Sequence, residues 1–238
     1  MKKIFMIGDS IMQTNKYNTY PQTGWGQVLY LFANEDVEII NLAKNGTSTK
    51  SFIDQGRFDH VKSNIKEDDL LIIGFAHNDE KIQDLLRYTR PFNEFKDNLK
   101  YFIDSAKKVN AKVVLCTPVV RRNFVDGILV ETHGEYVDAI KESAKENNIP
   151  LADLNKLSFE LVSSLKEDGS LSMYMNFNEN VYSNFPKGNN DNSHLRIEGA
   201  INIAKLFVSE VYKNSKFANE YFLELPSEKN CASDTYEK

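Results

Sequence analysis

The stretch Ile4-Phe-Met-Ile-Gly-Asp-Ser10 decides the fold, because a short apolar run passes directly into a turn that carries a serine. Three similar runs rich in Ile, Val and Leu follow in the first half of the chain, at residues 37–43, 70–75 and 113–117. A weaker fifth run, at residues 149–154, contains Pro150 and is expected near a sheet edge. Continuous apolar runs of this length are typical of strands buried on both faces.

Segments with helical spacing lie between and after these runs. The clearest of them repeats apolar residues at intervals of three and four, at Phe95, Leu99, Phe102, Ile103, Ala106 and Val109. Similar spacing occurs within residues 25–33, 137–144 and 197–211. Alternation of strands and helices implies right-handed crossovers and a parallel sheet covered on both faces. We therefore expect an α/β protein, a three-layer α/β/α sandwich around a five-stranded parallel sheet.

Length and composition limit the classes of protein that fit. With 238 residues, of which 41% are hydrophobic, the chain can bury one core, so we expect a single domain over residues 1–225. Residues 226–238 are polar and are expected to form a flexible tail. The formal charge of -5 provides no basic surface for nucleic acid. No apolar run approaches the roughly 18 residues of a membrane span, so no membrane partner is expected either.

The start of the chain and the cysteines favour a cytoplasmic location. The apolar run after Lys2 and Lys3 is only four residues long before Gly8, too short for an export signal. Two cysteines are too few for a disulfide framework. Cys116 ends an apolar run and is expected in the core, whereas Cys231 lies in the tail.

Polar clusters follow three of the predicted strands. Asp9 and Ser10 follow the first run, Gly46 follows the second, and His77 and Asn78 follow the third. Ligands of parallel sheets bind beyond the carboxyl ends of the strands. We therefore expect these three loops to converge on one edge of the sheet.

A serine in this position is a candidate nucleophile if a base is available. His194 is the natural base for the Ser10 hydroxyl, and Asp191 can hold the imidazole in the required tautomer. Gly46 can offer an unobstructed backbone N–H, and Asn78 an amide N–H, to a developing oxyanion. Each feature also has an ordinary structural interpretation: a turn serine, a turn glycine, a turn-capping amide, a helix-capping Asp191 and a surface histidine.

Taken together and in this order, Gly8-Asp9-Ser10, Gly46, Asn78 and Asp191–His194 resemble the four blocks of the SGNH (GDSL-type) hydrolases over roughly residues 3–212. The flanking sequence is most similar to the rhamnogalacturonan acetylesterases, in the segments Gly24-Trp25-Gly26, residues 45–52, Phe75-Ala-His-Asn-Asp79, residues 117–124 and 186–188. This chain has Ala76 where the third block usually has glycine, and Ser193 where the fourth usually has threonine.

The resemblance implies a flavodoxin-like fold without a metal or a cofactor. It also implies that Ser10 is the nucleophile and that Asp191 and His194 complete a catalytic triad. The backbone N–H groups of Ser10 and Gly46 and the side chain of Asn78 would form the oxyanion hole.

Further side chains are candidates for contacts with a substrate. They are Asp9 in the first block, His77 beside Asn78, Trp25, and Arg121, which with Arg122 can meet an acidic sugar carboxylate or remain a solvated loop charge. Trp25, Tyr174 and Tyr182 can stack on a sugar or pack in the protein. His60 and His133 are expected at the surface or as helix caps, and residues 168–192 as an ordered long loop.

The function expected from the resemblance is that of a serine esterase. It would remove O-acetyl groups from carbohydrate, such as acetylated pectic oligosaccharides of the rhamnogalacturonan type, through an acyl-enzyme. Two alternatives remain open: a lipase or thioesterase with longer acyl substrates, and a non-catalytic carbohydrate-binding protein. The expected partner is therefore a small molecule or an oligosaccharide, and the oligomeric state is left open.

Overall fold

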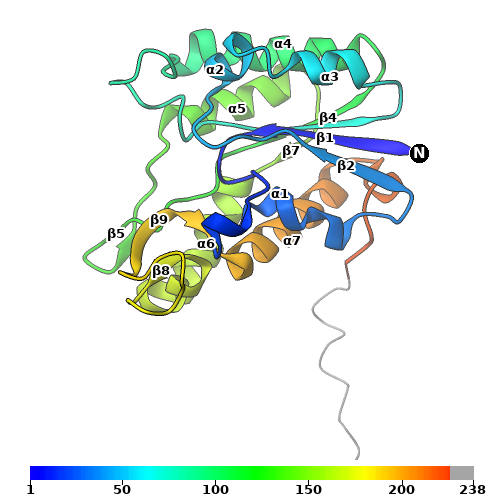
Figure 1. The fold of residues 1–238 in the computed structure, drawn as a ribbon. Coiled ribbons are helices and arrows are strands. Elements are labelled where there is room, and N and C mark those ends of the chain that lie inside the picture. Colours follow the sequence, from blue (N-terminus) through cyan, green and yellow to red (C-terminus); the bar gives the residue numbers. More distant parts are fainter. Residues whose placement is uncertain (226–238) are drawn as a thin grey trace, which may run out of the picture.

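The computed structural model describes residues 1–225, so the expected tail over residues 226–238, with Cys231, lies outside the described residues. A five-stranded parallel sheet forms the centre, with the strand order β2-β1-β3-β4-β7 (Figure 1). Its strands are β1 (Lys2–Gly8), β2 (Val37–Asn41), β3 (Leu70–Gly74), β4 (Lys112–Cys116) and β7 (Leu151–Ala152). The five predicted strands are confirmed, and the weakest of them, β7, is an edge strand as expected.

Helices cover both faces of this sheet and complete three layers (Figure 1). The upper layer contains α2 (Thr49–Asp54), α3 (Asp59–Asn64), α4 (Lys96–Lys107) and α5 (Glu135–Glu146). The lower layer contains α1 (Trp25–Val28), α6 (Leu154–Gly169) and α7 (Ile197–Asn214). Short helical turns are η1 (Tyr17–Thr19), η2 (Leu29–Phe32), η3 (Pro91–Phe95), η4 (Ser170–Met173) and η5 (Ala218–Glu220).

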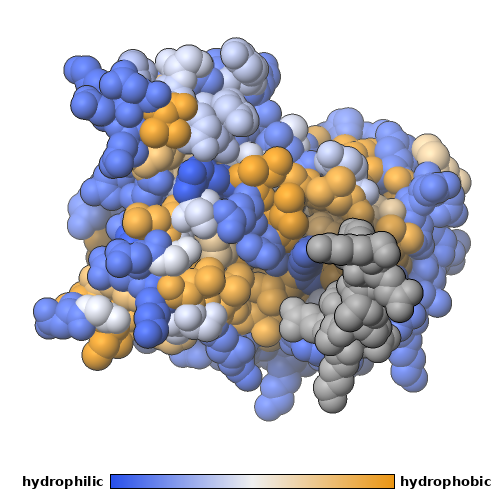
Figure 2. Space-filling model, turned by 90° about the horizontal axis from the view of Figure 1, so that it is seen from below, coloured by the Kyte–Doolittle hydropathy of each residue, from blue (hydrophilic) through white to orange (hydrophobic). Residues whose placement is uncertain are grey.

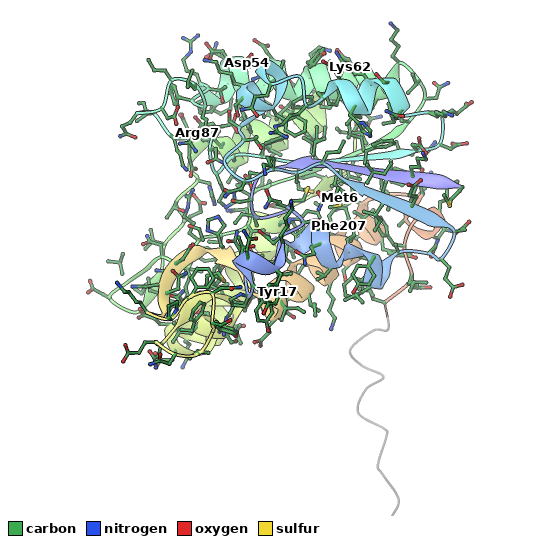
Figure 3. The ribbon with its side chains drawn as sticks, viewed as in Figure 1. Met6, Tyr17, Asp54, Lys62, Arg87 and Phe207 are labelled. Atoms are coloured by element: carbon green, nitrogen blue, oxygen red, sulfur yellow. The ribbon has the colours of Figure 1, made fainter. Side chains whose placement is uncertain are left out.

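Alternate residues of the strands face two separate apolar cores. Ile4 and Met6 of β1 point to the core under α1 and α7, whereas Phe5 and Ile7 point to the core under α2 to α5. Figure 3 labels Met6 and Phe207 on the lower side of the sheet. Each of these side chains is fully buried, which is worth about 1.5–3 kcal/mol per side chain.

Two antiparallel hairpins lie outside the central sheet, at the same end of the molecule (Figure 1). One pairs β5 (Phe124–Val125) with β6 (Ile128–Leu129). The other pairs β8 (Tyr174–Phe177) with β9 (Asn189–Leu195), in the region where the sequence predicts an ordered long loop. The segment that was predicted as a long loop therefore has a defined structure, but most of it is a hairpin. The strand β9 was not predicted because it is rich in asparagine and aspartate, which are uncommon in strands.

The lower face exposes part of its apolar surface. The view from below shows apolar residues gathered on this face (Figure 2). Ile197, the first residue of α7, is one of the large apolar side chains that remain exposed in the structure. Across residues 1–225, none of the helices combines the length and the apolar content needed to cross a bilayer.

Candidate active site

The turn after β1 presents Ser10 at the carboxyl edge of the sheet. Gly8 ends β1 beside β3, where a Cβ atom would lie only 2.5 Å from the Gly74 carbonyl oxygen, so glycine permits the close approach. The Asp9 carboxylate accepts a hydrogen bond of 3.0 Å from the Ile11 N–H and closes the turn. This turn holds the Ser10 hydroxyl beyond the end of the strand.

Hydrogen bonds join the three loops that follow β1, β2 and β3. The Thr47 hydroxyl, in the loop after β2, donates to the Gly8 carbonyl oxygen at 3.1 Å. The Asn78 amide, in the loop after β3, donates through Nδ2 to the Thr47 carbonyl oxygen at 3.0 Å. Segments that are 39 and 31 residues apart in the sequence therefore meet at one edge of the sheet, as the polar clusters indicate.

Ser10, His194 and Asp191 form a continuous hydrogen-bonded series. The Ser10 hydroxyl lies 2.9 Å from His194 Nε2, and His194 Nδ1 lies 2.6 Å from Asp191 Oδ2. The second carboxylate oxygen of Asp191 accepts the backbone N–H groups of Ser193 and His194 at 2.8 and 3.0 Å. The N-cap of α7 is Arg196, without a side-chain hydrogen bond, so Asp191 is not a cap of that helix.

The electrostatics of Asp191 favour the tautomer that a general base needs. Burial raises the pKa of Asp191, but the hydrogen bond and charge of His194 and the two backbone N–H donors outweigh it and lower the pKa to about 2. The ionised carboxylate accepts the Nδ1 proton of His194. Nε2 is then free to accept the proton of the Ser10 hydroxyl.

Three N–H groups in the loops that meet at this edge still have a hydrogen to donate. Gly46 has a φ of +78°, a left-handed conformation that favours glycine, in the loop tied to Gly8 through Thr47. Within residues 1–225, neither the Ser10 N–H nor the Gly46 N–H donates to a protein acceptor, and Asn78 uses one of its two Nδ2 hydrogens. This arrangement can serve an oxyanion, as proposed below.

Asp9 and His77 contact each other. His77 Nδ1 donates to Asp9 Oδ2 at 3.2 Å, and Asp9 is only 1% exposed. Burial raises the pKa of Asp9, but the charge and hydrogen bond of His77 outweigh burial, so the pKa of Asp9 lies below its usual value. Burial also lowers the pKa of His77, and the nearby Asp9 carboxylate only partly offsets this effect. This buried pair joins the loop after β3 to the Ser10 turn, and a contact of Asp9 or His77 with substrate stays a prediction.

His133 is buried, so the prediction of a surface or capping histidine is wrong for this residue. Its Nδ1 lies 3.0 Å from Glu80 Oε2, and its Nε2 lies 3.0 Å from the Val119 carbonyl oxygen. Both ring nitrogens therefore lie within hydrogen-bond distance of an oxygen of the protein. The ring packs edge-on against His77, with centroids 4.6 Å apart. His60, in contrast, is exposed in α3 as predicted.

The other candidate substrate contacts are mostly engaged within the protein. Arg121 pairs with Glu80 and donates to Thr132, and Arg122 is buried, so neither is a free loop charge. Trp25 is 2% exposed and packs on Phe207, which corrects its assignment as a sugar-binding residue. Tyr174 is buried in the core, and Tyr182 is half-buried against Tyr20.

Arg87 and Glu80 also belong to this site, although no sequence pattern indicates them. Arg87 Nη1 donates to Asn78 Oδ1 at 3.1 Å, and Glu80 joins His133 to Arg121. Both lie in the turns after the third block, where a charged residue has no pattern that distinguishes it from a solvated loop charge. Ala76, the departure in that block, is buried and packs its methyl group in the upper core.

The fold and the hydrogen-bonded series of hydroxyl, imidazole and carboxylate define a class of protein, the serine hydrolases with an α/β/α sandwich. The model of the GDSL-like lipase/acylhydrolase family matches residues 4–207, and the chain belongs to this family of carboxylic ester hydrolases.

Two curated relatives cover most of the chain. It is 37% identical over 210 residues to the rhamnogalacturonan acetylesterase RhgT of Bacillus subtilis, covering 87% of this chain and 89% of the relative. It is 34% identical over 203 residues to the probable rhamnogalacturonan acetylesterase YesY of the same organism, covering 85% and 89%.

Solved structures support the fold. The crystal structure of YxiM from Bacillus subtilis superimposes with a TM-score of 0.76 at 27% identity, covering 89% of this chain and 56% of that one. The acetylxylan esterase Axe2 of Geobacillus stearothermophilus superimposes with a TM-score of 0.62 at 16% identity, covering 88% and 94%. The predicted SGNH hydrolase fold is therefore confirmed.

Proposed function

We propose that this chain is a carbohydrate O-acetylesterase that acts on acetylated pectic oligosaccharides of the rhamnogalacturonan type. The observation that carries the proposal is the 2.9 Å contact between the Ser10 hydroxyl and His194 Nε2, in a chain whose relatives are named rhamnogalacturonan acetylesterases. The proposed domain spans residues 1–225. A membrane or nucleic-acid partner is not part of the proposal.

In the first half of the proposed reaction, the Ser10 oxygen attacks the acetyl carbonyl carbon while His194 Nε2 takes the hydroxyl proton. The carbonyl oxygen becomes an oxyanion and accepts hydrogen bonds from the N–H groups of Ser10 and Gly46 and from Asn78 Nδ2. The bond to the sugar oxygen then breaks, and His194 returns its proton to that oxygen. The products are a free sugar hydroxyl and acetyl-Ser10.

In the second half, water attacks the acetyl-Ser10 ester, and His194 takes a proton from that water. Collapse of the second tetrahedral intermediate returns the proton from His194 to Ser10 and releases acetic acid, which ionises to acetate in water. Asp191 remains ionised throughout and stabilises the imidazolium in both halves. The reaction balances with water as the only co-substrate, and the proposal includes no metal or cofactor.

The test is release of acetate from acetylated rhamnogalacturonan oligosaccharides, with acetylated xylooligosaccharides and 4-nitrophenyl esters of increasing chain length as comparisons. We expect the wild type to release acetate and Ser10→Ala to lose at least about 10³-fold in kcat. Ser164→Ala removes a hydroxyl from an exposed position of α6 and should leave the rate unchanged. Equal rates for wild type and Ser10→Ala would refute the mechanism.

The same measurements separate the alternatives. Rates that rise with acyl length would favour a lipase or thioesterase, and saccharide binding without release of acetate would favour a non-catalytic binding protein. The cytoplasmic location stays a prediction from the sequence, and cell fractionation tests it.

A further inference from the structure

Arg87 lies at the edge of the sheet where the three loops meet (Figure 3). Its Nε donates to Asp84 Oδ2 at 2.6 Å, and its Nη2 also contacts that carboxylate. Its Nη1 donates to Asn78 Oδ1 at 3.1 Å and lies 3.9 Å from the position that a Cβ atom of Gly46 would occupy. One guanidinium group is therefore held by Asp84, hydrogen-bonded to Asn78 and close to Gly46.

The hydrogen bonds of the Asn78 side chain fix its orientation. The Thr47 carbonyl can only accept, so the atom that contacts it at 3.0 Å is the amide nitrogen. A guanidinium can only donate, so the atom that contacts Arg87 is the amide oxygen. With both ends of the amide assigned, one Nδ2 hydrogen points to Thr47 and the second remains for a substrate oxyanion.

We propose that Arg87 is a positioning residue that fixes and polarises the Asn78 amide for stabilisation of the oxyanion. This inference rests on the proposed function. A cation that binds the amide oxygen draws electron density toward it, which makes the N–H groups of the same amide stronger donors. The gain is largest in the transition state, where the substrate oxygen carries negative charge.

The chemistry of this contact requires arginine. Its planar fork binds the Asp84 carboxylate through Nε and Nη2 and still directs Nη1 at Asn78. A lysine ammonium is a single point charge that cannot occupy both positions at once. Arg87→Lys should therefore retain the charge but lose most of the effect, which separates a directed contact from a general positive field.

A double-mutant cycle on 4-nitrophenyl acetate tests the proposal, since this neutral ester offers no anion for Arg87 to bind. We expect Arg87→Gln to lower kcat about tenfold, with KM changed less than about threefold. Asn78→Ala should lower kcat about 10²-fold or more. If Arg87 acts through Asn78, the double variant should be no slower than Asn78→Ala alone.

The matched control is Arg90→Gln. Arg90 also forms an ion pair with a carboxylate, that of Glu94, but it is more exposed and makes no contact with Asn78 within the described residues. This variant should keep the wild-type kcat. In addition, millimolar guanidinium should restore part of the rate of Arg87→Ala, and should leave the rates of Asn78→Ala and wild type unchanged.

A transition-state mimic gives an independent measurement. Methylboronic acid forms a tetrahedral anionic adduct with an active serine, and its affinity should fall in Arg87→Gln by the same factor as kcat/KM. Losses that multiply in the double variant, an effect on KM alone, or no loss would each overturn the proposal. Full activity of Ser10→Ala would instead overturn the proposed function, so the two failures are distinguishable.

Discussion

Replacing Glu80 with glutamine removes the negative charge that lies between the His133 imidazole and the Arg121 guanidinium. Glu80 Oε2 lies 3.0 Å from His133 Nδ1, and Oε1 pairs with Arg121. The side chain of His133 is fully buried and that of Glu80 is 16% exposed, so solvent screens these contacts only weakly. The substitution should therefore destabilise the protein most at pH values at which the Glu80 carboxylate is ionised.

The magnitude follows from the pKa of Glu80. Burial raises this pKa, but His133 and then Arg121 outweigh it and lower the pKa from 4.5 to about 2. A difference of about 2.5 pH units, at about 1.36 kcal/mol per unit, is worth about 3 kcal/mol of folding free energy at pH 7. Because the folded-state pKa is the lower one, this stability is present above pH 4.5 and is lost as the pH falls toward 2.

The assay is urea unfolding of wild type and Glu80→Gln between pH 7 and pH 3.5. We expect the stability difference to be about 3 kcal/mol at pH 7 and to shrink by about 1.4 kcal/mol at pH 3.5. Glu94→Gln is the control, because Glu94 is also paired with an arginine but in solvent, and it should change stability little. A difference for Glu80→Gln that is small, or that does not vary with pH, would refute the interpretation of Glu80 as a charge-paired buried carboxylate.

Three further predictions concern the active site and the packing. Asp191→Asn should lower kcat on 4-nitrophenyl acetate by about 10³- to 10⁴-fold, because an amide can stabilise the wrong imidazole tautomer; steady-state kinetics against wild type check this. Gly199→Ala should destabilise the protein by about 1–3 kcal/mol in urea unfolding, because its Cβ would lie 2.2 Å from the Met173 carbonyl oxygen. Cys116 is 2% exposed, and burial raises its pKa above the usual 9.0. A Cys231→Ser variant should therefore react with a thiol reagent only after unfolding.

The central sheet could be predicted from the sequence because its strands are continuous apolar runs that are buried on both faces. The strand β9 could not be, since its residues Asn189–Leu195 are mostly polar and it pairs with β8 alone. Helix α6 (Leu154–Gly169) was also missed, because only Asp153 separates it from the edge strand β7 and the apolar run of the strand was expected to continue to Leu154.

The residues proposed for chemistry were identified because each lies in a short block just after a strand or just before a helix. The block order indicated that Ser10 and His194 come together across 184 positions. The residues that form hydrogen bonds and ion pairs around these blocks were not identified from the sequence. The pairing of Glu80 with His133 spans 53 positions and is determined by the tertiary fold alone, as is the contact of Arg87 with Asn78.

The hairpin that carries His194 is anchored to the sheet by Arg122, which follows β4. Its backbone N–H and Nη1 donate to the carbonyl and side-chain oxygens of Asn192 at 2.8 and 3.1 Å, and its Nε donates to Ser170 at 3.1 Å. Replacing Arg122 with alanine would let His194 move away from Ser10. An alanine scan that measures turnover would then show as large a loss for Arg122 as for a residue that binds the sugar. Loss of such an anchor should lower kcat/KM equally for every ester, large or small. Loss of a sugar-binding side chain should lower kcat/KM for oligosaccharide esters and leave that of the smallest esters unchanged.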